Sequence, residues 1–171
     1  APLYHSAPQA AVSLTLRIGG TVVIMERFDP LEYLDLIERY QISHTQLVPT
    51  MFSRMLKLTE AERTRADLSS LEIAVHAAAP CPVMVKQQMI AWWGPIIHEY
   101  YGATEGLGFA ACNSQEWLAH QGTVGKVVLG DLTILDDEMQ PLPNGEPGTL
   151  WFKTATEFSY HNDAAKTAES T

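Results

Sequence analysis

A short run near the middle of the chain combines residue types that bind phosphate and a divalent cation. It reads Glu99-Tyr100-Tyr101-Gly102-Ala103-Thr104-Glu105-Gly106 and follows a predicted strand, Ile96–Tyr101. Ligands of open α/β sheets bind at the carboxyl ends of the strands. Thr104 offers a hydroxyl to a phosphate oxygen, Glu105 offers the hard oxygen ligand that Mg²⁺ prefers, and Tyr101 offers a flat ring on which a base such as adenine can stack.

The glycines of this run add a second property. Gly102 and Gly106 allow a ligand to approach the backbone closely. Taken alone, however, the run fits a tight turn with a solvated glutamate and a core tyrosine better than a binding site, because short glycine-containing loops are common. The run becomes specific only together with other motifs.

The elements that must position these residues alternate between helices and strands. Apolar spacing predicts a helix over Pro8–Ile18, then a buried strand over Thr21–Met25 and a helix that Asp29 caps and Pro30 begins. The later elements follow in the order strand His44–Val48, helix from Pro49, strand Leu71–His76, small-residue turn Ala77-Ala78-Ala79-Pro80, helix Pro82–Trp93 and strand Ile96–Tyr101. Strands separated by helices of about 10–15 residues imply crossover connections and a mainly parallel sheet.

The pattern changes after about Gly122. Three strands joined by turns are predicted there, over Thr123–Leu129, Leu132–Asp136 and Thr149–Lys153. We therefore expect an α/β fold, with a mostly parallel sheet and flanking helices in a first subdomain, residues 1–121. A small antiparallel β unit is expected to begin a second, truncated subdomain, residues 122–171.

Composition excludes several classes of protein. The 171 residues are 46% hydrophobic and carry a formal net charge of −9, which argues against nucleic acid or an anionic membrane as the main partner. No apolar run approaches the roughly 20 residues that span a bilayer. The two cysteines, Cys81 and Cys112, have no metal-binding spacing and fit reduced thiols in a cytoplasmic protein.

Four separated stretches, in one order, resemble the motifs of the adenylate-forming superfamily, which includes acyl-CoA synthetases, aryl-CoA ligases, luciferases and peptide-synthetase adenylation domains. They are Pro2-Leu3-Tyr4-His5, His76-Ala77-Ala78-Ala79-Pro80, Tyr101-Gly102-Ala103-Thr104-Glu105, and Thr123-Val124-Gly125-Lys126 with Gly145-Glu146-Pro147-Gly148-Thr149-Leu150. Tyr160 and Thr167 fit the segment that precedes the family's ribose-binding Asp. The resemblance covers essentially the whole chain. The stretch from His76 to Ile97 looks more like bacterial CoA ligases of the fatty-acid type than like peptide-synthetase domains, without indicating the acyl chain length.

The resemblance implies an ATP-dependent acyl-CoA ligase. Such an enzyme activates a carboxylic acid as acyl-AMP and transfers the acyl group to CoA, with Mg²⁺ and fixed donors neutralising the phosphates. It implies that Thr104 contacts phosphate, that Glu105 binds Mg²⁺, and that His5 borders the carboxylate and the thiol path. The implied ATP and AMP contacts come from Ala78, Ala79, Pro80, Tyr101, Gly102, Ala103 and Thr104. His76 stands where many relatives carry Ser or Gly, so its role is open.

The resemblance also implies that parts are missing. The family's phosphate loop would precede residue 1, while its ribose-binding Asp and adenylation Lys would follow Thr171. We therefore expect an internal fragment that is inactive alone, although a processed complete domain is an alternative. Unpaired strand edges and uncovered apolar faces would favour self-association into a homo-oligomer. Two other readings stay open: an adenylating enzyme that loads a carrier protein, and a non-catalytic binding module that keeps the fold.

Overall fold

The fold was obtained as a computed structural model, which describes residues 3–153 and 158–170, with side chains described as far as Ala168. Its elements in chain order are α1 (Ser6–Arg17), α2 (Pro30–Tyr40), β1 (His44–Leu47), α3 (Pro49–Met55), α4 (Glu60–Arg63), β2 (Ile73–His76), α5 (Val83–Trp93), β3 (Ile97–Gly102), β4 (Phe109–Cys112), α6 (Ser114–Ala119), β5 (Lys126–Leu129), β6 (Asp131–Leu135), β7 (Thr149–Lys153) and α7 (Ala164–Ser170).

The strands form two sheets. The larger sheet has the order β1-β2-β3-β4-β5, and β1, β2 and β3 run parallel to one another. The smaller sheet consists of β6 and β7, which pair antiparallel. The mostly parallel α/β sheet and a small antiparallel unit are therefore confirmed. The first strand predicted for the antiparallel unit, Thr123–Leu129, instead forms β5 of the larger sheet.

The chain divides into two compact units. One comprises residues 1–101 and 111–125, and the other comprises residues 102–110 and 126–171. The division falls inside the Tyr101–Glu105 motif. The predicted subdomain boundary near Gln121 stays a prediction, because compactness alone does not show where one folding domain ends.

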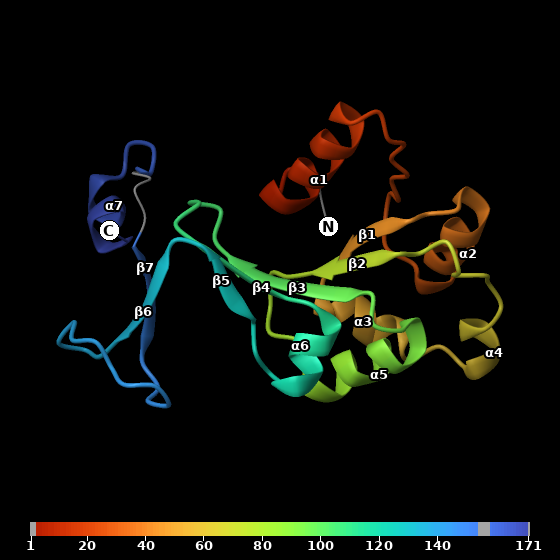
Figure 1. Cartoon of the computed structure of the whole chain (residues 1–171). Helices are drawn as coiled ribbons and strands as arrows, with labels where there is room; N and C mark the ends of the chain where they lie inside the picture. Colours follow the sequence, from red (N-terminus) through yellow and green to blue (C-terminus); the bar gives the residue numbers. More distant parts are fainter. Residues whose placement is uncertain (1–2, 154–157, 171) are drawn as a thin grey trace. The chain divides into compact units, whose positions relative to one another are not determined.

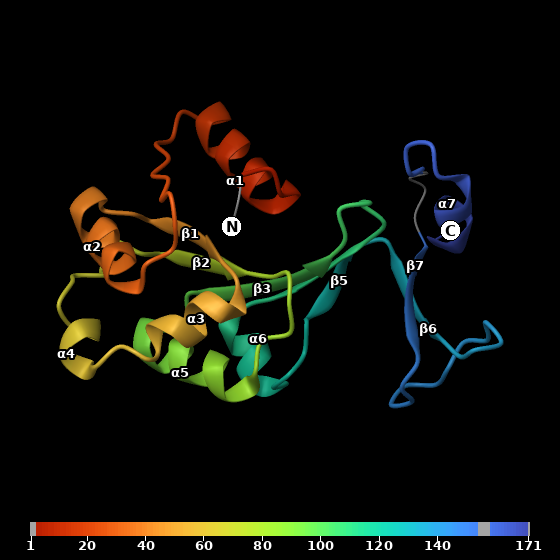
Figure 2. The same ribbon diagram turned by 180° about the vertical axis from the view of Figure 1, so that it is seen from behind.

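The core of the first unit lies between its sheet and three helices. In both views α3, α5 and α6 cover the same face of β2 and β3 (Figures 1 and 2). Side chains alternate along these strands, so Ala74 and Ile97 point into the core together with Phe52, Met89 and Trp117. Burial of these large apolar side chains is the main contribution to the stability of this unit.

Local signals in the sequence explain where several elements begin. Asp29 accepts hydrogen bonds from the backbone N–H groups of Leu31 and Glu32, and Pro30 occupies the first turn of α2, as predicted. Pro49 likewise begins α3. Gly125 has φ +100°, and a Cβ atom there would lie 2.0 Å from the carbonyl oxygen of Ala111. Only glycine fits this close approach of two backbone segments.

The predicted strand over Thr21–Met25 is wrong. Residues 21–25 adopt no regular structure, and Ile24 is exposed. β-branched residues favour a strand only where a neighbouring strand supplies hydrogen bonds and packing, and neither sheet includes this segment.

Strand β4 and helices α4 and α6 were not predicted from the sequence. β4 and α6 lie between the Tyr101–Glu105 motif and Gly125. A capping box formed by Asn113 and Glu116 begins α6, and this spacing was readable in the sequence. None of the helices in the described ranges combines the length and apolar character that a membrane crossing requires.

Candidate functional site

The first residues of the Tyr101–Glu105 motif end β3, and the chain turns after them. Tyr101 is 44% exposed, so one part of its ring is accessible to a ligand. The backbone N–H of Gly106 donates to the carbonyl of Ala103 at 3.1 Å, which closes a turn that holds Thr104 and Glu105. Thr104 is exposed and Glu105 is half-buried. The predicted phosphate and metal residues therefore lie on one short hydrogen-bonded turn.

Glu105 is oriented by a residue far away in the sequence. The hydroxyl of Tyr160 donates a 2.6 Å hydrogen bond to Glu105 Oε1. This bond is the largest cause of the lowered pKa of Glu105, and a hydrogen bond from the Glu105 backbone and the charge of Lys166 lower the pKa further. The carboxylate is thus held in its ionised form, which is the form that binds a cation.

Tyr160 is itself fixed by the segment that contains α7. Its backbone N–H donates to Thr167 Oγ1 at 2.9 Å, and Lys166 Nζ lies 4.2 Å from the centre of its ring. Asp163 Oδ1 accepts from the backbone N–H of Lys166 at 3.0 Å, which caps the helix. Tyr160 and Thr167 are therefore in direct contact, and this contact supports the residue that holds Glu105.

The metal that the resemblance implies fits this donor set. Among the described residues no cluster of three or more His, Cys, Asp or Glu side chains is arranged to hold a metal ion. Mg²⁺ often binds to only one or two carboxylates and takes its other ligands from water and substrate phosphates. A single ionised carboxylate on an exposed turn suits that mode of binding.

The small-residue turn after β2 carries local backbone strain. Ala77 is buried, whereas Ala78, Ala79 and Pro80 are exposed and present little side-chain bulk. Ala78 has φ +76°, a conformation that costs an L-residue other than glycine about 1–2 kcal/mol. The turn therefore presents small, accessible side chains at the end of β2.

His5 lies on another element. It is the exposed residue that precedes α1, and its carbonyl accepts from the N–H of Gln9 at 3.1 Å. Its ring lies 4.7 Å from that of Tyr4, centre to centre. Pro2, which begins the first matched motif, lies outside the described residues.

The predicted site residues fall into two sets. His5, Ala78, Ala79, Pro80 and Tyr101 belong to the first unit, and the stretch Gly102-Ala103-Thr104-Glu105 belongs to the second. The structure gives the geometry of each set by itself.

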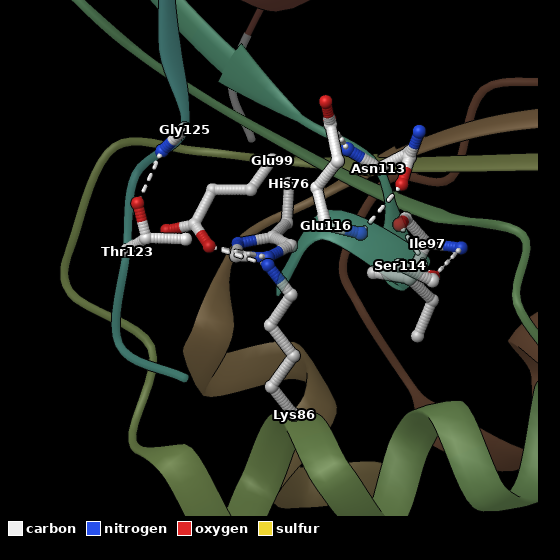
Figure 3. Close-up of polar contacts among 9 residues, drawn as sticks. All are labelled: His76, Lys86, Ile97, Glu99, Asn113, Ser114, Glu116, Thr123 and Gly125. Carbon is white, nitrogen blue, oxygen red and sulfur yellow. Dashed lines mark hydrogen bonds and ion pairs between the residues drawn. The ribbon is translucent and has the colours of Figure 1, made fainter. Parts of the chain in front are cut away.

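A buried polar cluster behind the small-residue turn was missed. It consists of His76, Lys86 and Glu99, whose side chains converge in Figure 3. Glu99 Oε2 lies 2.5 Å from Lys86 Nζ and 3.5 Å from His76 Nε2. The available signal was Lys86, a charged residue on the same face of its helix as Met89 and Ile90, which are buried.

Burial decides the protonation of His76. Its side chain is fully buried, and this burial, followed by the positive charge of Lys86, lowers the pKa of His76 to about 3. The imidazole is therefore neutral at physiological pH. The nearby Cys81 thiol is inert for a similar reason, since burial and the charge of Glu99 raise its pKa to about 11.

Comparisons with known proteins show the family to which the chain belongs. Residues 1–159 match the model of the AMP-binding enzyme family. The medium/long-chain-fatty-acid–CoA ligase FadD8 of Mycobacterium tuberculosis is 30% identical over 152 residues, which are 87% of this chain and 26% of the ligase. The 4-coumarate–CoA ligase 1 of Oryza sativa subsp. japonica is 30% identical over 160 residues, which are 87% of this chain and 28% of that ligase.

A solved structure agrees with these relatives. The amide bond synthetase McbA from Marinactinospora thermotolerans superposes with a TM-score of 0.84 and 30% identity, over 99% of this chain and 35% of the synthetase. The chain therefore belongs to the AMP-binding enzyme family, as its motifs predicted. It spans about a quarter to a third of the length of these proteins. The roles of its individual residues stay predictions.

Proposed function

We propose that the protein containing this chain is an acid–CoA ligase, which activates a carboxylic acid with ATP as acyl-AMP and passes the acyl group to CoA. The observation that carries the proposal is the motif turn itself, an exposed Thr104 beside a Glu105 carboxylate that Tyr160 keeps ionised and oriented. Membership of the AMP-binding enzyme family supports the same chemistry.

In this proposal the first unit binds the nucleotide base. Ala78, Ala79 and Pro80 present a nearly flat surface to adenine, and Tyr101 offers its exposed ring for stacking. Each contact excludes water from one part of the base, which contributes to affinity without fixing the identity of the acid.

In this proposal the motif turn of the second unit binds the phosphates and the cation. Gly102 and Ala103 leave the backbone open to a phosphate, Thr104 donates its hydroxyl to a phosphate oxygen, and Glu105 holds the cation. When bound, Mg²⁺ neutralises the charge that develops on the phosphates during transfer. His5 borders the carboxylate and the thiol in this proposal.

A fatty acid is the substrate that we propose. FadD8 is named for medium- and long-chain fatty acids, while 4-coumarate–CoA ligase 1 is named for an aromatic acid at the same identity. The test must therefore include both classes. Two cysteines that form no disulfide, Cys81 and Cys112, fit the reducing cytoplasm, where we propose that the enzyme acts.

The test is ATP–pyrophosphate exchange by the full-length protein with a panel of fatty and aromatic acids. Exchange that depends on an acid, and that Glu105→Gln lowers by about a hundredfold or more, supports the proposal. Glu138→Gln, at an exposed turn between β6 and β7, is the matched control and should retain exchange. A folded protein that exchanges with no acid contradicts the proposal and favours a binding module.

The acceptor is tested separately. Formation of the CoA thioester from acid, ATP and CoA, without any carrier protein, supports the ligase. Exchange without thioester formation would assign the acyl group to another acceptor, either a carrier protein or the amine implied by the name of the amide bond synthetase.

A further inference from the structure

One carboxylate oxygen lies close to side chains on both sides of the turn 77–80, which we propose to contact adenine. His76 is the last residue of β2 and directly precedes Ala77, while Lys86 lies in the first turns of α5, just after the turn. Glu99 Oε2 lies 3.5 Å from His76 Nε2 and 2.5 Å from Lys86 Nζ (Figure 3). The carboxylate therefore pairs with Lys86 on one side of the turn and lies next to the His76 ring on the other.

The Glu99 carboxylate lies on the same strand as Tyr101, the other residue that we propose to contact adenine. His76 and Glu99 are register partners in the parallel pair β2 and β3. Glu99 precedes Tyr101 by two residues in β3, so its position and that of Tyr101 are coupled along one short strand. A change at Glu99 thus acts on both of the segments proposed to contact the base.

Stability alone is a weak reason for this cluster. Lys86 is fully buried and Glu99 is 7% exposed, so both charges have lost almost all hydration. Buried ion pairs of this kind can often be replaced by apolar residues of similar size with no loss of stability, whereas loss of one partner is costly. Lys86 Nζ is held further by the ring of Trp117, whose centre lies 4.9 Å away.

His76 completes the arrangement without adding charge. Its ring packs edge-on against Phe52, with 5.3 Å between ring centres, and its low pKa keeps it neutral. Neither ring nitrogen makes a hydrogen bond within the described residues, and Nε2 lies at the outer limit of a hydrogen bond to Glu99. Its imidazole thus packs against Phe52 and lies beside Glu99 without adding a charge to the cluster.

We propose that His76, Lys86 and Glu99 are positioning residues that hold the turn 77–80 and the end of β3 in the geometry that binds adenine. The inference rests on the proposed function, because it needs a nucleotide at this turn. The three side chains do not touch the reacting atoms. They act on the affinity for ATP through the backbone that they hold.

The experiment compares four forms of the full-length protein: wild type, Lys86→Met, Glu99→Gln and the double variant K86M/E99Q. ATP binding is measured by calorimetry, the KM values for ATP and for the acid by pyrophosphate exchange, and stability by thermal unfolding. Arg65→Met is the matched control. Like the tested variants it breaks an ion pair, the one between Arg65 and Asp35, but at an exposed position. It should leave ATP binding unchanged.

Each single variant leaves one buried charge unpaired, so we expect both lower thermal stability and weaker ATP binding. The double variant has no unpaired charge and should regain stability. It should still bind ATP about tenfold more weakly, with the KM for the acid changed less than about twofold, because displacement of a positioning group lowers affinity without loss of fold. This split is the result that supports the inference.

A double variant that binds ATP as tightly as the wild type overturns the inference and makes the cluster a part of the core only. If the double variant does not fold, Glu99→Asp provides the test of the inference. This variant keeps the charge and withdraws the carboxylate by one methylene. Weaker ATP binding at unchanged stability then supports the inference, and wild-type binding overturns it. A wild-type protein that binds ATP but exchanges with no acid contradicts the proposed function only.

Discussion

Tyr160 donates a 2.6 Å hydrogen bond to the Glu105 carboxylate across 55 residues of sequence. A hydrogen bond to an ionised acceptor is stronger and more directional than one between neutral groups. It occupies Oε1 of the carboxylate. Tyr160, which provides it, is held from the α7 segment by Lys166 at its ring and by Thr167 at its backbone N–H. The carboxylate proposed to bind Mg²⁺ is therefore oriented by the second unit itself.

Tyr160→Phe removes this hydrogen bond and keeps the ring. We expect the Mg²⁺ concentration that gives half-maximal pyrophosphate exchange to rise about fivefold, because a freely rotating carboxylate is less well prepared for the cation. The rate at saturating Mg²⁺ should change less. A Mg²⁺ titration of exchange by the full-length protein measures both quantities.

Tyr40→Phe provides the matched control, because Tyr40 is exposed at the end of α2, in the first unit. It should leave the Mg²⁺ requirement as in the wild type. An unchanged requirement in Tyr160→Phe would show that Glu105 needs no orienting partner.

Ala78→Gly relieves the strain at the small-residue turn. With φ +76°, Ala78 adopts a conformation that glycine reaches without steric cost. We expect the free energy of unfolding to increase by up to about 1 kcal/mol, the strain being partly offset by the greater freedom of glycine in the unfolded chain. Urea denaturation measures the change.

Ala79→Gly is the control for this prediction. Ala79 is not among the residues with positive φ in the described part of the chain, so glycine there adds only unfolded-state freedom and should lower stability. Equal effects of the two substitutions would mean that Ala78 is not strained.

The sequence predicted the starts of two helices of the first unit correctly because the signals for them are local. Asp29 with Pro30, and Pro49, mark the starts of helices through capping and a fixed φ, which need no tertiary partner. The strand predicted over Thr21–Met25 failed because β structure depends on a neighbour that the sequence pattern does not reveal.

The candidate site likewise has residues that the sequence could reveal and contacts that it could not. Thr104 and Glu105 were identified because their motif is contiguous. The hydrogen bond from Tyr160 to Glu105 joins residues 55 positions apart, and the contact of Lys86 with Glu99 joins a helix to a strand. Such contacts follow from tertiary packing, so the spacing of the residues alone could not predict them.

Ser114→Ala should destabilise the first unit. Ser114 is fully buried, and its hydroxyl donates to the Ile97 carbonyl at 2.7 Å and accepts from the Ile97 N–H at 3.1 Å (Figure 3). Alanine leaves two buried backbone groups without these partners, at a cost of about 2–3 kcal/mol. Ser53→Ala, which removes one part-buried bond to the Pro49 carbonyl, should cost about 1 kcal/mol or less.

Urea denaturation compares the two serine variants at one pH. Equal losses would show that the Ile97 backbone finds other partners in the variant.

His76 makes the stability of the protein depend on pH. Its pKa is about 3 in the folded state and near the ordinary value of 6.5 in the unfolded chain. Between these two pH values the unfolded chain binds more protons, so the free energy of unfolding falls as the pH is lowered from 6.5 toward 3. The slope that one such proton contributes is at most about 1.4 kcal/mol per pH unit.

His76→Gln removes this titration and leaves Lys86 and Glu99, the charged groups that face it, in place. We expect the stability of the wild type to fall more steeply between pH 6 and pH 4, by about 1 kcal/mol per pH unit, than that of the variant. His44→Gln, at an exposed position in β1, corrects for general effects of replacing a histidine. Denaturant unfolding at several pH values measures the slopes, and parallel slopes for wild type and His76→Gln would show that His76 is protonated as readily in the folded protein as in the unfolded chain.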